Sequence, residues 1–297
     1  MKSLPNLLNK CKVLYNEPLC NHTSFRIGGP ADALALPESR DELLGLISNL
    51  KNDSIRFMIM GNGSNLLFSD SGYRGAVIKL SRMSALNISN DIISAEAGVL
   101  LSSAATEAMK AGLAGFEFGS GIPGTVGGAV FMNAGAYGDE IKDVFLHAEV
   151  LTDKGSINIY TCEEMDFGYR RSRLNENGIL LSASFKLNAG EYGSIKAKTD
   201  ELNNARRSKQ PLEMPSAGSV FRRPPGLYAG KLIMDSGLRG YSIGGAQVSE
   251  KHCGFIVNKG GASCDDVLRL IEHIQATVLS QFNVSLVPEI RIIPCNS

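Results

Sequence analysis

The chain has 297 residues, of which 43% are hydrophobic and 20% charged, a composition that indicates a folded globular protein and excludes disorder over most of the length. Lysine plus arginine and aspartate plus glutamate number 30 each, so the net charge of zero provides no general attraction to nucleic acid or a membrane surface. No long apolar segment appears near the N-terminus or further along, so we expect no export signal, no membrane span and a cytoplasmic location.

The cysteines and histidines form no metal-binding pattern. The six cysteines include no C-x-x-C pair, and the four histidines include no H-E-x-x-H sequence. Cys253 beside His252 comes nearest to a ligand pair, but reduced cysteines in the core or on loops explain the spacing better. We therefore predict no metal site and no disulfide framework.

The first part of the chain shows elements with clear ends. Ser39–Glu42 has the sequence of a capping box, and apolar residues follow it at helical spacing. A strand is predicted at 56–60, before a glycine-rich turn. The other elements predicted here are strands at 75–80 and 92–97 and a helix at 101–111 that ends at Gly112.

The second part mixes strands and helices without strict alternation. Its predicted strands are 147–152, 156–160, 179–186 and 254–258, together with a final strand at 284–293 that Pro288 interrupts. Its predicted helices are 198–209, 229–236 and a long helix that Ser263 caps. Residues 210–218 have the composition of a linker. This order favours the α+β class over a doubly wound sheet, and the chain length predicts about two domains.

Glycine, with 32 residues, is the most informative residue type because its positions are clustered. The segment Gly61–Asn65 places consecutive backbone N–H groups in a turn that can bind a phosphate or pyrophosphate. An ordinary turn between two strands explains the same five residues, and both interpretations stay open on this segment alone.

The densest glycine segment, 119–128, contains the spacing G-x-G-x-x-G at Gly119, Gly121 and Gly124. Pro123 lies inside this motif, and more glycines follow it closely. A helix that packs on a dinucleotide-binding sheet is not interrupted in this way, so we reject that fold. We predict instead a second group of backbone donors around a large anionic cofactor.

Two other segments carry groups suited to catalysis. Arg170 and Arg171 lie in Gly168–Ser172, and a guanidinium group suits a carboxylate or an enolate-like oxygen, although such pairs are usually solvated. Ser219 follows Gly218 and either faces a cleft or simply begins a strand. No G-x-S-x-G sequence is present, which argues against a serine hydrolase.

Glu289 follows Pro288 in an apolar context formed by Leu286, Val287 and Ile290. Buried carboxylates have shifted pKa values and often serve catalysis. An outward-facing strand residue is an equal alternative for Glu289.

The order of these segments decides between the alternatives. Seven segments follow one another, namely 21–32 (NHTSFRIGGPAD), 61–67 (GNGSNLL), 121–129 (GIPGTVGGA), Tyr169–Arg170, 218–221 (GSVF), 248–252 (VSEKH) and 288–291 (PEIR). Together they resemble the MurB family of UDP-N-acetylenolpyruvoylglucosamine reductases. The resemblance runs from about residue 20 to the C-terminus and points to the shorter class, which lacks an inserted tyrosine loop.

The resemblance implies a two-subdomain FAD-binding fold of the vanillyl-alcohol-oxidase (PCMH) type, followed by an α+β substrate domain. The expected FAD-binding domain is 1–209, with subdomains of approximately 1–80 and 81–209, and the expected substrate domain is 210–297. The implied activity is the NADPH-dependent reduction of UDP-N-acetylglucosamine enolpyruvate to UDP-N-acetylmuramate through FAD. We expect a monomer without nucleic-acid or membrane partners.

The resemblance also implies roles for individual residues. Arg170 and Glu289 are expected to stabilise an enolate-like intermediate, and Ser219 is expected to protonate it as general acid. The implied FAD contacts are Arg26, Ile27, Gly28, Gly29, Gly61, Asn62, Gly63, Ser64, Asn65, Leu66, Gly121, Ile122, Pro123, Gly124, Thr125, Gly127, Gly128 and Ala129. The candidate substrate contacts are Tyr169, Arg222, Lys231, Gln247, Lys251 and His252.

Two alternatives remain at this point. An FAD-dependent oxidoreductase of the same fold could act on another substrate, because a fold does not determine a reaction; it would have no need of Ser219 as a proton donor. A non-catalytic nucleotide-sugar binding protein would hold no flavin.

Overall fold

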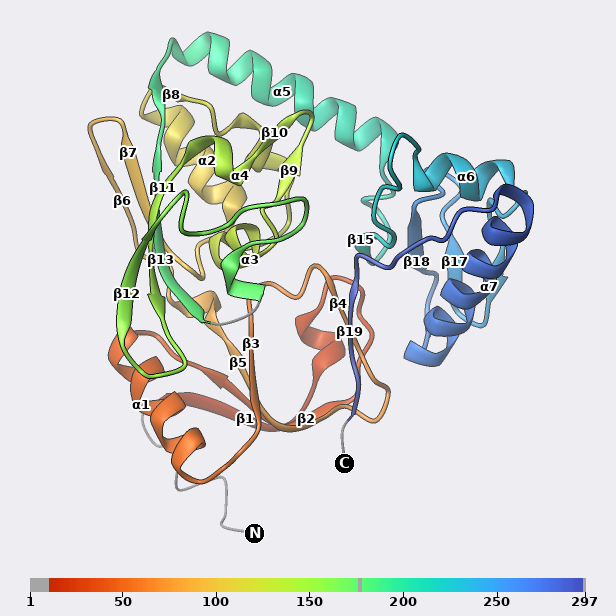
Figure 1. The fold of residues 1–297 in the computed structure, drawn as a ribbon, viewed down its shortest axis with the longest axis horizontal. Helices are drawn as coiled ribbons and strands as arrows, with labels where there is room; N and C mark the ends of the chain where they lie inside the picture. The colour runs from red at the N-terminus through yellow and green to blue at the C-terminus, as the bar shows by residue number, and fades with distance from the viewer. Residues whose placement is uncertain (1–10, 176–177, 296–297) are drawn as a thin grey trace. The chain divides into compact units, whose positions relative to one another are not determined.

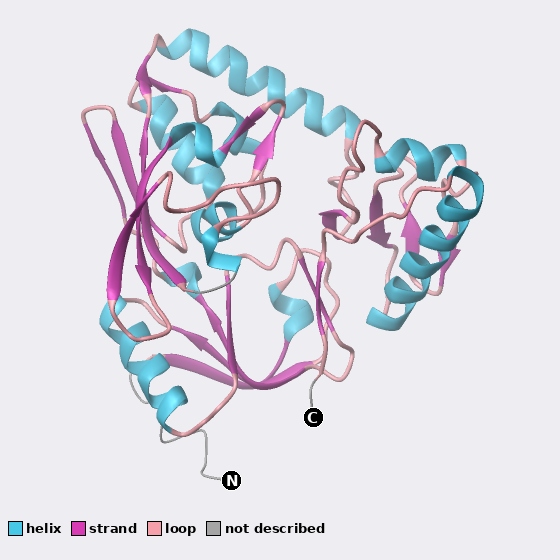
Figure 2. Cartoon of the chain, viewed as in Figure 1, coloured by secondary structure: helices cyan, strands magenta, loops and turns pink. Residues whose placement is uncertain are grey.

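The computed structural model describes residues 11–175 and 178–295. The prediction that no export signal occupies the N-terminus falls partly on residues 1–10 and lies outside the described residues there. Within the described ranges, no helix is both long and apolar enough to cross a bilayer. Helices and strands are interspersed along the chain (Figure 2), and the α+β prediction is confirmed.

The chain divides into two compact units, each built from separate stretches of sequence. Unit 1 contains residues up to Val13, then Ala35–Asn62 and Val77–Arg206. Unit 2 contains Leu14–Leu34, Gly63–Ala76 and the residues from Arg207 onward. The predicted FAD-binding domain 1–209 and the predicted substrate domain 210–297 stay a prediction.

Unit 1 is built around an antiparallel sheet with the strand order β12-β11-β13-β7-β6 (Figure 1). Helices α2 and α3 contact β7, and α3 also contacts β13, so short helices lie against this sheet. The strands are β6 (Leu86–Ser89), β7 (Ile92–Glu96), β11 (Phe145–Leu151), β12 (Ile157–Thr161) and β13 (Ile179–Lys186). The helices are α1 (Arg40–Asn52), α2 (Leu101–Lys110), α3 (Val126–Phe131), α4 (Ile141–Val144) and α5 (Tyr192–Lys209), whose last residues from Arg207 onward belong to unit 2.

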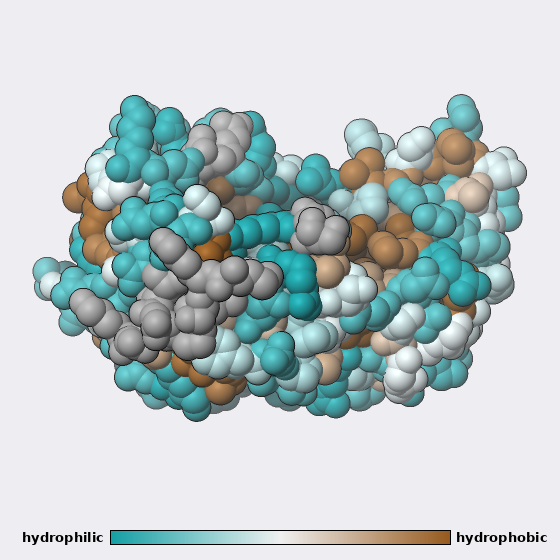
Figure 3. All heavy atoms as spheres, turned by 90° about the horizontal axis from the view of Figure 1, so that it is seen from below, coloured by the Kyte–Doolittle hydropathy of each residue, from teal (hydrophilic) through white to brown (hydrophobic). Residues whose placement is uncertain are grey.

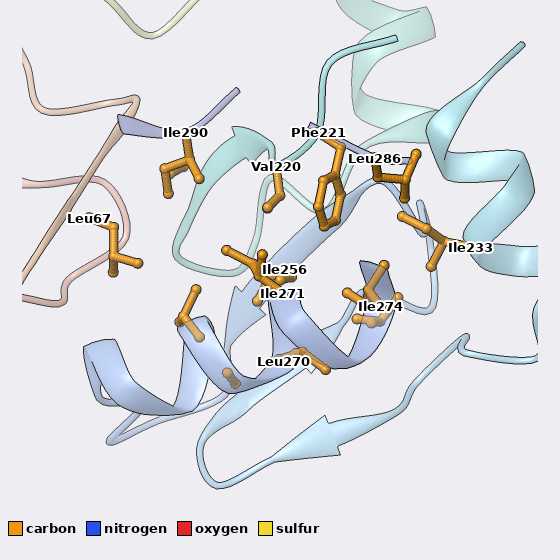
Figure 4. Close-up of a cluster of buried hydrophobic side chains, with 14 of the residues drawn as sticks. Leu67, Val220, Phe221, Ile233, Ile256, Leu270, Ile271, Ile274, Leu286 and Ile290 are labelled. Carbon is orange, nitrogen blue, oxygen red and sulfur yellow. The ribbon is translucent and has the colours of Figure 1, made fainter. Parts of the chain in front are cut away.

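Unit 2 contains an antiparallel sheet with the order β15-β18-β17-β16, on which helix α7 packs. A cluster of buried side chains from this sheet, α6, α7 and the segment 286–290 forms its core, with Ile256, Ile271 and Ile274 among them (Figure 4). The elements are β15 (Ser216–Ser219), α6 (Ala229–Asp235), β16 (Ser242–Ile243), β17 (Ala246–Val248), β18 (Phe255–Asn258), α7 (Cys264–Phe282) and the parallel pair β4 (Leu66–Phe68) and β19 (Arg291–Ile293).

The remaining strands form one further sheet and two short pairs. The sheet has the order β1-β2-β5-β3, and the pairs are β10-β9 and β14-β8. Their bounds are β1 (Lys12–Pro18), β2 (Pro30–Leu36), β3 (Phe57–Met60), β5 (Tyr73–Lys79), β8 (Leu113–Ala114), β9 (Gly135–Ala136), β10 (Asp139–Glu140) and β14 (Asn188–Ala189). Short 3-10 helices lie at Leu19–His22, Leu80–Arg82, Glu117–Gly121 and Arg173–Asn175.

Helix termini follow the predicted capping residues, with one difference. Ser39 accepts a hydrogen bond from the Glu42 backbone N–H, as predicted, but the Glu42 carboxylate accepts from Glu38 N–H at 2.8 Å rather than from Ser39. The second hydrogen bond of the expected capping box is therefore made to the N–H of the residue before Ser39. At α7 the full box is present, since Ser263 and Asp266 each accept from the other's N–H.

The structure departs from the predicted elements in several places. Helix α5 begins at Tyr192 rather than at residue 198, and two further differences concern segments of the candidate site. The final strand is only Arg291–Ile293, because 284–290 hydrogen-bonds irregularly, with a single bridge between Phe221 and Pro288. The glycine-rich segment contains a helix that the sequence analysis did not predict, α3, which Thr125 caps through a bond from Gly128 N–H. Glycine weakens a helix, so its presence concealed this short one.

The surface mixes polar and apolar side chains. On the face drawn in Figure 3, hydrophilic groups cover much of the surface and hydrophobic groups lie between them. Exposed large apolar residues are spread along the sequence, and Tyr137, Ile159 and Leu212 are examples. Isolated exposed apolar residues are normal, so they identify no partner.

Candidate active site

Unit 1 brings the predicted glycine segments together. The Asn62 side-chain amide donates to the Pro123 carbonyl at 2.8 Å. A Cβ atom at Gly61 would lie 2.3 Å from Thr125 Oγ1, so only glycine permits this approach. Two segments that the sequence analysis treated separately therefore form one structural feature.

We expect Gly61→Ala to disturb this contact and lower the free energy of unfolding by about 1–3 kcal/mol, because the added methyl group has no space. FAD affinity should fall as well, since the neighbouring N–H groups would move. Thermal melting and flavin absorbance after gel filtration measure the two effects.

Gly45→Ala is the matched control for this change. A Cβ atom there meets nothing within 4 Å, and the position lies inside helix α1, so alanine should stabilise the protein by about 0.5–1 kcal/mol. Equal melting temperatures for the two variants would contradict the steric argument.

The Gly61–Asn65 turn has the donors that an anion needs. Within the described residues, the backbone N–H groups of Asn62, Gly63 and Ser64 make no hydrogen bond to another protein group. Backbone donors without partners are rare in folded proteins, and consecutive ones suit the oxygens of a pyrophosphate. The turn therefore has the donors to bind a phosphate or pyrophosphate, and its contact with FAD stays a prediction.

The second glycine segment is held by hydrogen bonds to the residues that directly follow strand β7. Val126 N–H donates to Val99 O at 2.8 Å, and Gly127 N–H donates to Ala97 O at 2.9 Å. A Cβ at Gly127 would lie 3.0 Å from Ala97 O, so this glycine has a packing reason of its own. The segment is fixed by the protein, whatever it binds.

The predicted FAD residues Arg26 to Gly29 lie in unit 2. Phe25 and Ile27 are buried in its core, whereas Arg26 between them is exposed and has a left-handed backbone with φ 55°. Arg26 lines a pocket of about 420 Å³ together with Cys20, Asn21 and Thr23. The alternation of buried, exposed and buried residues directs the guanidinium group outward.

Gly29 has a structural reason for its identity. A Cβ atom there would lie 2.0 Å from the backbone oxygen of Asp70, so any other residue would separate these two segments. Gly28 has a φ of +136°, which side chains rarely adopt. The glycines of this segment are thus explained by the fold, and a cofactor contact at them stays a prediction.

Arg170 is presented by a tight turn in unit 1. Gly168 and Arg171 exchange two backbone hydrogen bonds of 3.0 and 3.2 Å, and Arg170 has a left-handed backbone with φ 55°. The Arg170 guanidinium lies 5.2 Å from the centre of the Tyr169 ring. An arginine in this conformation is strained, and such strain is concentrated at functional sites.

The sequence analysis missed Asn133, which supports this turn. Its side chain is fully buried, and its amide donates to Gly168 O at 3.2 Å and to Glu140 Oε2 at 2.9 Å. Its oxygen accepts from Lys142 N–H at 3.0 Å. The only sequence signal was an amide within a small, apolar segment, which is too weak to predict a buried support.

We expect Arg170→Gly to separate stability from catalysis. Glycine relieves the left-handed strain but makes the unfolded chain more flexible, so the free energy of unfolding should change by less than about 1 kcal/mol. Reoxidation of reduced flavin by substrate should slow by about 10²- to 10³-fold, because a charge-stabilising group is lost. Urea unfolding and stopped-flow absorbance measure the two.

Asn90→Gly is the control for the Arg170 variant. Asn90 is exposed and also left-handed, with φ 54°, in the turn between β6 and β7. It should show the same backbone effect with unchanged flavin kinetics. A large loss of stability in Arg170→Gly alone would assign Arg170 a structural role instead.

Ser219 is placed by a bulge in unit 2. Ser216 pairs with Val257 and Ser219 with Phe255, so β15 has one more residue than β18 between these pairs. Gly218, with φ +76°, supplies the left-handed residue of the bulge. The bulge changes the direction of the Ser219 side chain, whose hydroxyl lies 3.3 Å from Phe221 O and 3.5 Å from Gly254 O.

Glu289 lies close to Ser219 through the backbone. Glu289 N–H donates to Val220 O at 2.7 Å, and Val220 follows Ser219 directly. The Asn65 side chain donates to Glu289 O at 3.2 Å, so one predicted FAD residue holds the backbone of a predicted catalytic residue. The half-exposed Ser219 and Glu289 therefore lie on neighbouring segments of unit 2.

The predicted substrate residues of unit 2 vary in their surroundings. Arg222 is exposed, whereas Gln247 is buried and donates to Gly240 O at 2.9 Å. Lys231 pairs with Asp235 at 2.7 Å and Lys251 with Glu213 at 3.5 Å, so each cation has an acidic neighbour.

His252 is held as a neutral ring. Its Nδ1 accepts from Gly254 N–H at 3.1 Å, and burial lowers the pKa of the imidazole. A neutral His252 supplies a hydrogen bond rather than a positive charge. No cluster of metal-ligating side chains occurs in residues 11–175 and 178–295.

Comparisons with known proteins agree with this arrangement. Residues 31–159 match the family model of the FAD binding domain, and residues 210–293 match that of the UDP-N-acetylenolpyruvoylglucosamine reductase C-terminal domain. A UDP-N-acetylenolpyruvoylglucosamine reductase of Caldanaerobacter subterraneus subsp. tengcongensis is 55% identical over 291 residues, which cover 98% of this chain and 96% of the relative. The chain belongs to the MurB family.

Further relatives support the assignment to the MurB family. A UDP-N-acetylenolpyruvoylglucosamine reductase of Clostridium botulinum is 48% identical, covering 97% of this chain and 95% of the relative. The crystal structure of MurB from Thermus caldophilus has a TM-score of 0.82 and 36% identity, covering 96% of this chain and 99% of that one. The predicted fold, an FAD-binding fold of the PCMH type with a C-terminal α+β domain, is confirmed.

Proposed function

We propose that the protein reduces UDP-N-acetylglucosamine enolpyruvate to UDP-N-acetylmuramate with NADPH, as an FAD enzyme of peptidoglycan precursor synthesis. The observation that carries this function is the 55% identity to a UDP-N-acetylenolpyruvoylglucosamine reductase over nearly the whole chain. The matches to an FAD binding domain and to the reductase's C-terminal domain support cofactor and reaction together.

FAD would be held by the two linked glycine segments and by the Arg26 segment. The free N–H groups of Asn62 to Ser64 would donate to its pyrophosphate, and Arg26 would add a positive charge. The chemistry that bound FAD would supply is hydride transfer from NADPH to the enolpyruvyl group. The protein's residues orient the substrate and supply the proton.

Hydride addition to the vinyl CH₂ carbon leaves negative charge on the neighbouring carbon and its carboxylate. Arg170 would bind this enolate-like group, because a guanidinium group offers a fork of donors to two oxygens. Glu289 would stabilise it by donating a hydrogen bond, for which its carboxyl group must carry the proton.

Ser219 would deliver a proton to the α-carbon as general acid. A serine hydroxyl is a weak acid in water, so it acts only beside a strongly basic intermediate. The bulge at Gly218 and the carbonyls of Phe221 and Gly254 hold the Ser219 oxygen in one orientation. Proton and hydride together form the D-lactyl ether of the product.

The substrate's uridine diphosphate would be bound by Tyr169, Arg222, Lys231, Gln247, Lys251 and His252. The cations in this set suit the negative charge of the diphosphate. His252, whose pKa is lowered by burial, suits an uncharged group of the substrate. We also propose that the protein acts as a monomer in the cytoplasm, without nucleic-acid or membrane partners.

The test is an anaerobic absorbance experiment on the purified protein. NADPH should bleach the spectrum of bound flavin, and UDP-N-acetylglucosamine enolpyruvate should restore it. A flavin that bleaches and does not recover would favour a reductase or oxidase of the same fold with another substrate. A protein that takes up no FAD would contradict the proposed function.

A further inference from the structure

The side chain of Asn258, at the end of β18, is buried, and its amide both donates and accepts hydrogen bonds. Asn258 is 7% exposed. Its Nδ2 donates to the carbonyl of Phe25 at 3.2 Å and lies 3.5 Å from that of Arg26. Its Oδ1 accepts from Gly260 N–H at 2.9 Å and from Ala262 N–H at 3.1 Å.

These bonds hold the one part of the Arg26 segment where the backbone is strained. Arg26 has a left-handed φ of 55°, and the buried Phe25 and Ile27 fix its neighbours in the core of unit 2. The two carbonyls that flank Arg26 are those of Phe25 and of Arg26 itself. Within the described residues, the Asn258 amide is the donor that both of them face, and buried carbonyls need such a partner. A residue 232 positions further along the chain therefore determines how Arg26 is presented.

Other bonds hold different parts of the same segment. Ser24 Oγ donates to Ser216 O at 2.7 Å, and Thr23 Oγ1 donates to Ile27 O at 3.3 Å. Neither contacts the carbonyl of Phe25 or of Arg26. The Asn258 amide is thus suited to hold the peptide groups that flank Arg26.

We infer that Asn258 is a positioning residue for FAD binding, which acts by fixing the backbone of Phe25 and Arg26. This inference rests on the proposed function, because it takes Arg26 as a contact of FAD. Asn258 itself is buried under the segment and makes its effect through the two carbonyls.

Asn258→Asp removes the donor role of the side chain and keeps its acceptor role. Aspartate has nearly the same shape and still accepts from Gly260 and Ala262, but it cannot donate and places a negative charge against the carbonyls. Asn258→Ala removes the donor without adding charge, although it removes the acceptor as well, and it replaces Asn258→Asp if that variant does not fold. Gln275→Glu is the matched control, since Gln275 Nε2 donates to Leu286 O at 2.8 Å in the same unit.

The experiment has two readouts on the full-length, FAD-loaded protein. Trypsin cuts after arginine, so cleavage between Arg26 and Ile27 at saturating FAD reports local opening of the segment. Equilibrium dialysis measures the Kd of FAD. We expect Asn258→Asp to speed this cleavage and to raise the Kd at least about tenfold, whereas Gln275→Glu should do neither even if both variants melt earlier.

The outcomes distinguish a failure of the inference about Asn258 from a failure of the proposed function. Cleavage at the wild-type rate would overturn the inference and leave the FAD assignment intact. Faster cleavage with an unchanged Kd would overturn the role of the segment in FAD binding. Wild-type protein that binds no FAD would refute the proposed function, and the cleavage rate would still show whether Asn258 holds the segment.

Discussion

Ser219→Ala is expected to leave flavin reduction by NADPH nearly unchanged and to slow reoxidation by the enolpyruvate substrate about 10²- to 10⁴-fold, the usual contribution of a general acid. The hydroxyl takes part only after hydride has reached the substrate, so the first half-reaction does not depend on it. Single-turnover absorbance measurements, with NADPH and substrate added in sequence, resolve the two steps.

The structure indicates that this variant will fold. Ser219 is half-buried, and Gly254 O, one of the two carbonyls near its hydroxyl, also accepts from Val220 N–H at 2.9 Å. The loss of the hydroxyl should therefore cost about 1 kcal/mol of stability. Ser216→Ala, in the same strand, is the matched control, because the Ser216 backbone oxygen makes its hydrogen bond to Ser24.

A slow first half-reaction combined with a normal second one in Ser219→Ala would exclude the proton-donor role. Equal slowing of both steps would point to displaced flavin instead. Slow reoxidation in Ser216→Ala as well would assign the effect to the strand rather than to the hydroxyl.

Substitution of Glu289 should also slow reoxidation, by about 10²- to 10³-fold for Glu289→Ala, because a donor aimed at developing charge is removed. Glu289→Gln keeps a donor and nearly the same shape. If Glu289 acts by donating a hydrogen bond, glutamine should retain much more activity than alanine. Stopped-flow absorbance of the second half-reaction measures this order.

Both variants should preserve the backbone around Glu289. Its N–H donates to Val220 O and its carbonyl accepts from Asn65, and neither bond involves the side chain. Circular dichroism and the melting temperature should therefore stay close to wild type. Glutamine and alanine variants with equal, large losses would show that the negative charge itself is needed.

Sequence patterns predicted elements whose ends have a local cause. Ser39, Gly112 and Ser263 end or begin helices through contacts within a few residues, and the structure has these helices at the expected places. The final strand, in contrast, was predicted too long because distant partners determine its structure. The segment 284–290 has the apolar pattern of a strand, but its bonds to Val220 and Arg222 come from another part of the chain.

The site shows the same division. Residue types suited to each role were visible in order along the chain, and the family resemblance followed from that order. Supporting amides such as Asn133 and Asn258 were not visible, because their importance lies in which carbonyls they contact. Those carbonyls lie 35 residues away for Asn133 and more than two hundred for Asn258.

The pairing of β4 with β19 has a consequence for the order of folding during synthesis. Asn65 and Glu289, which lie beside this pair, are 224 residues apart, so β4 leaves the ribosome long before its partner strand exists. Until residues 291–293 have been made, β4 has an edge that other chains can contact, and distant pairing of this kind folds slowly. A nascent chain stalled before Arg291 should therefore engage chaperones or aggregate, although most of its helices and strands are already present.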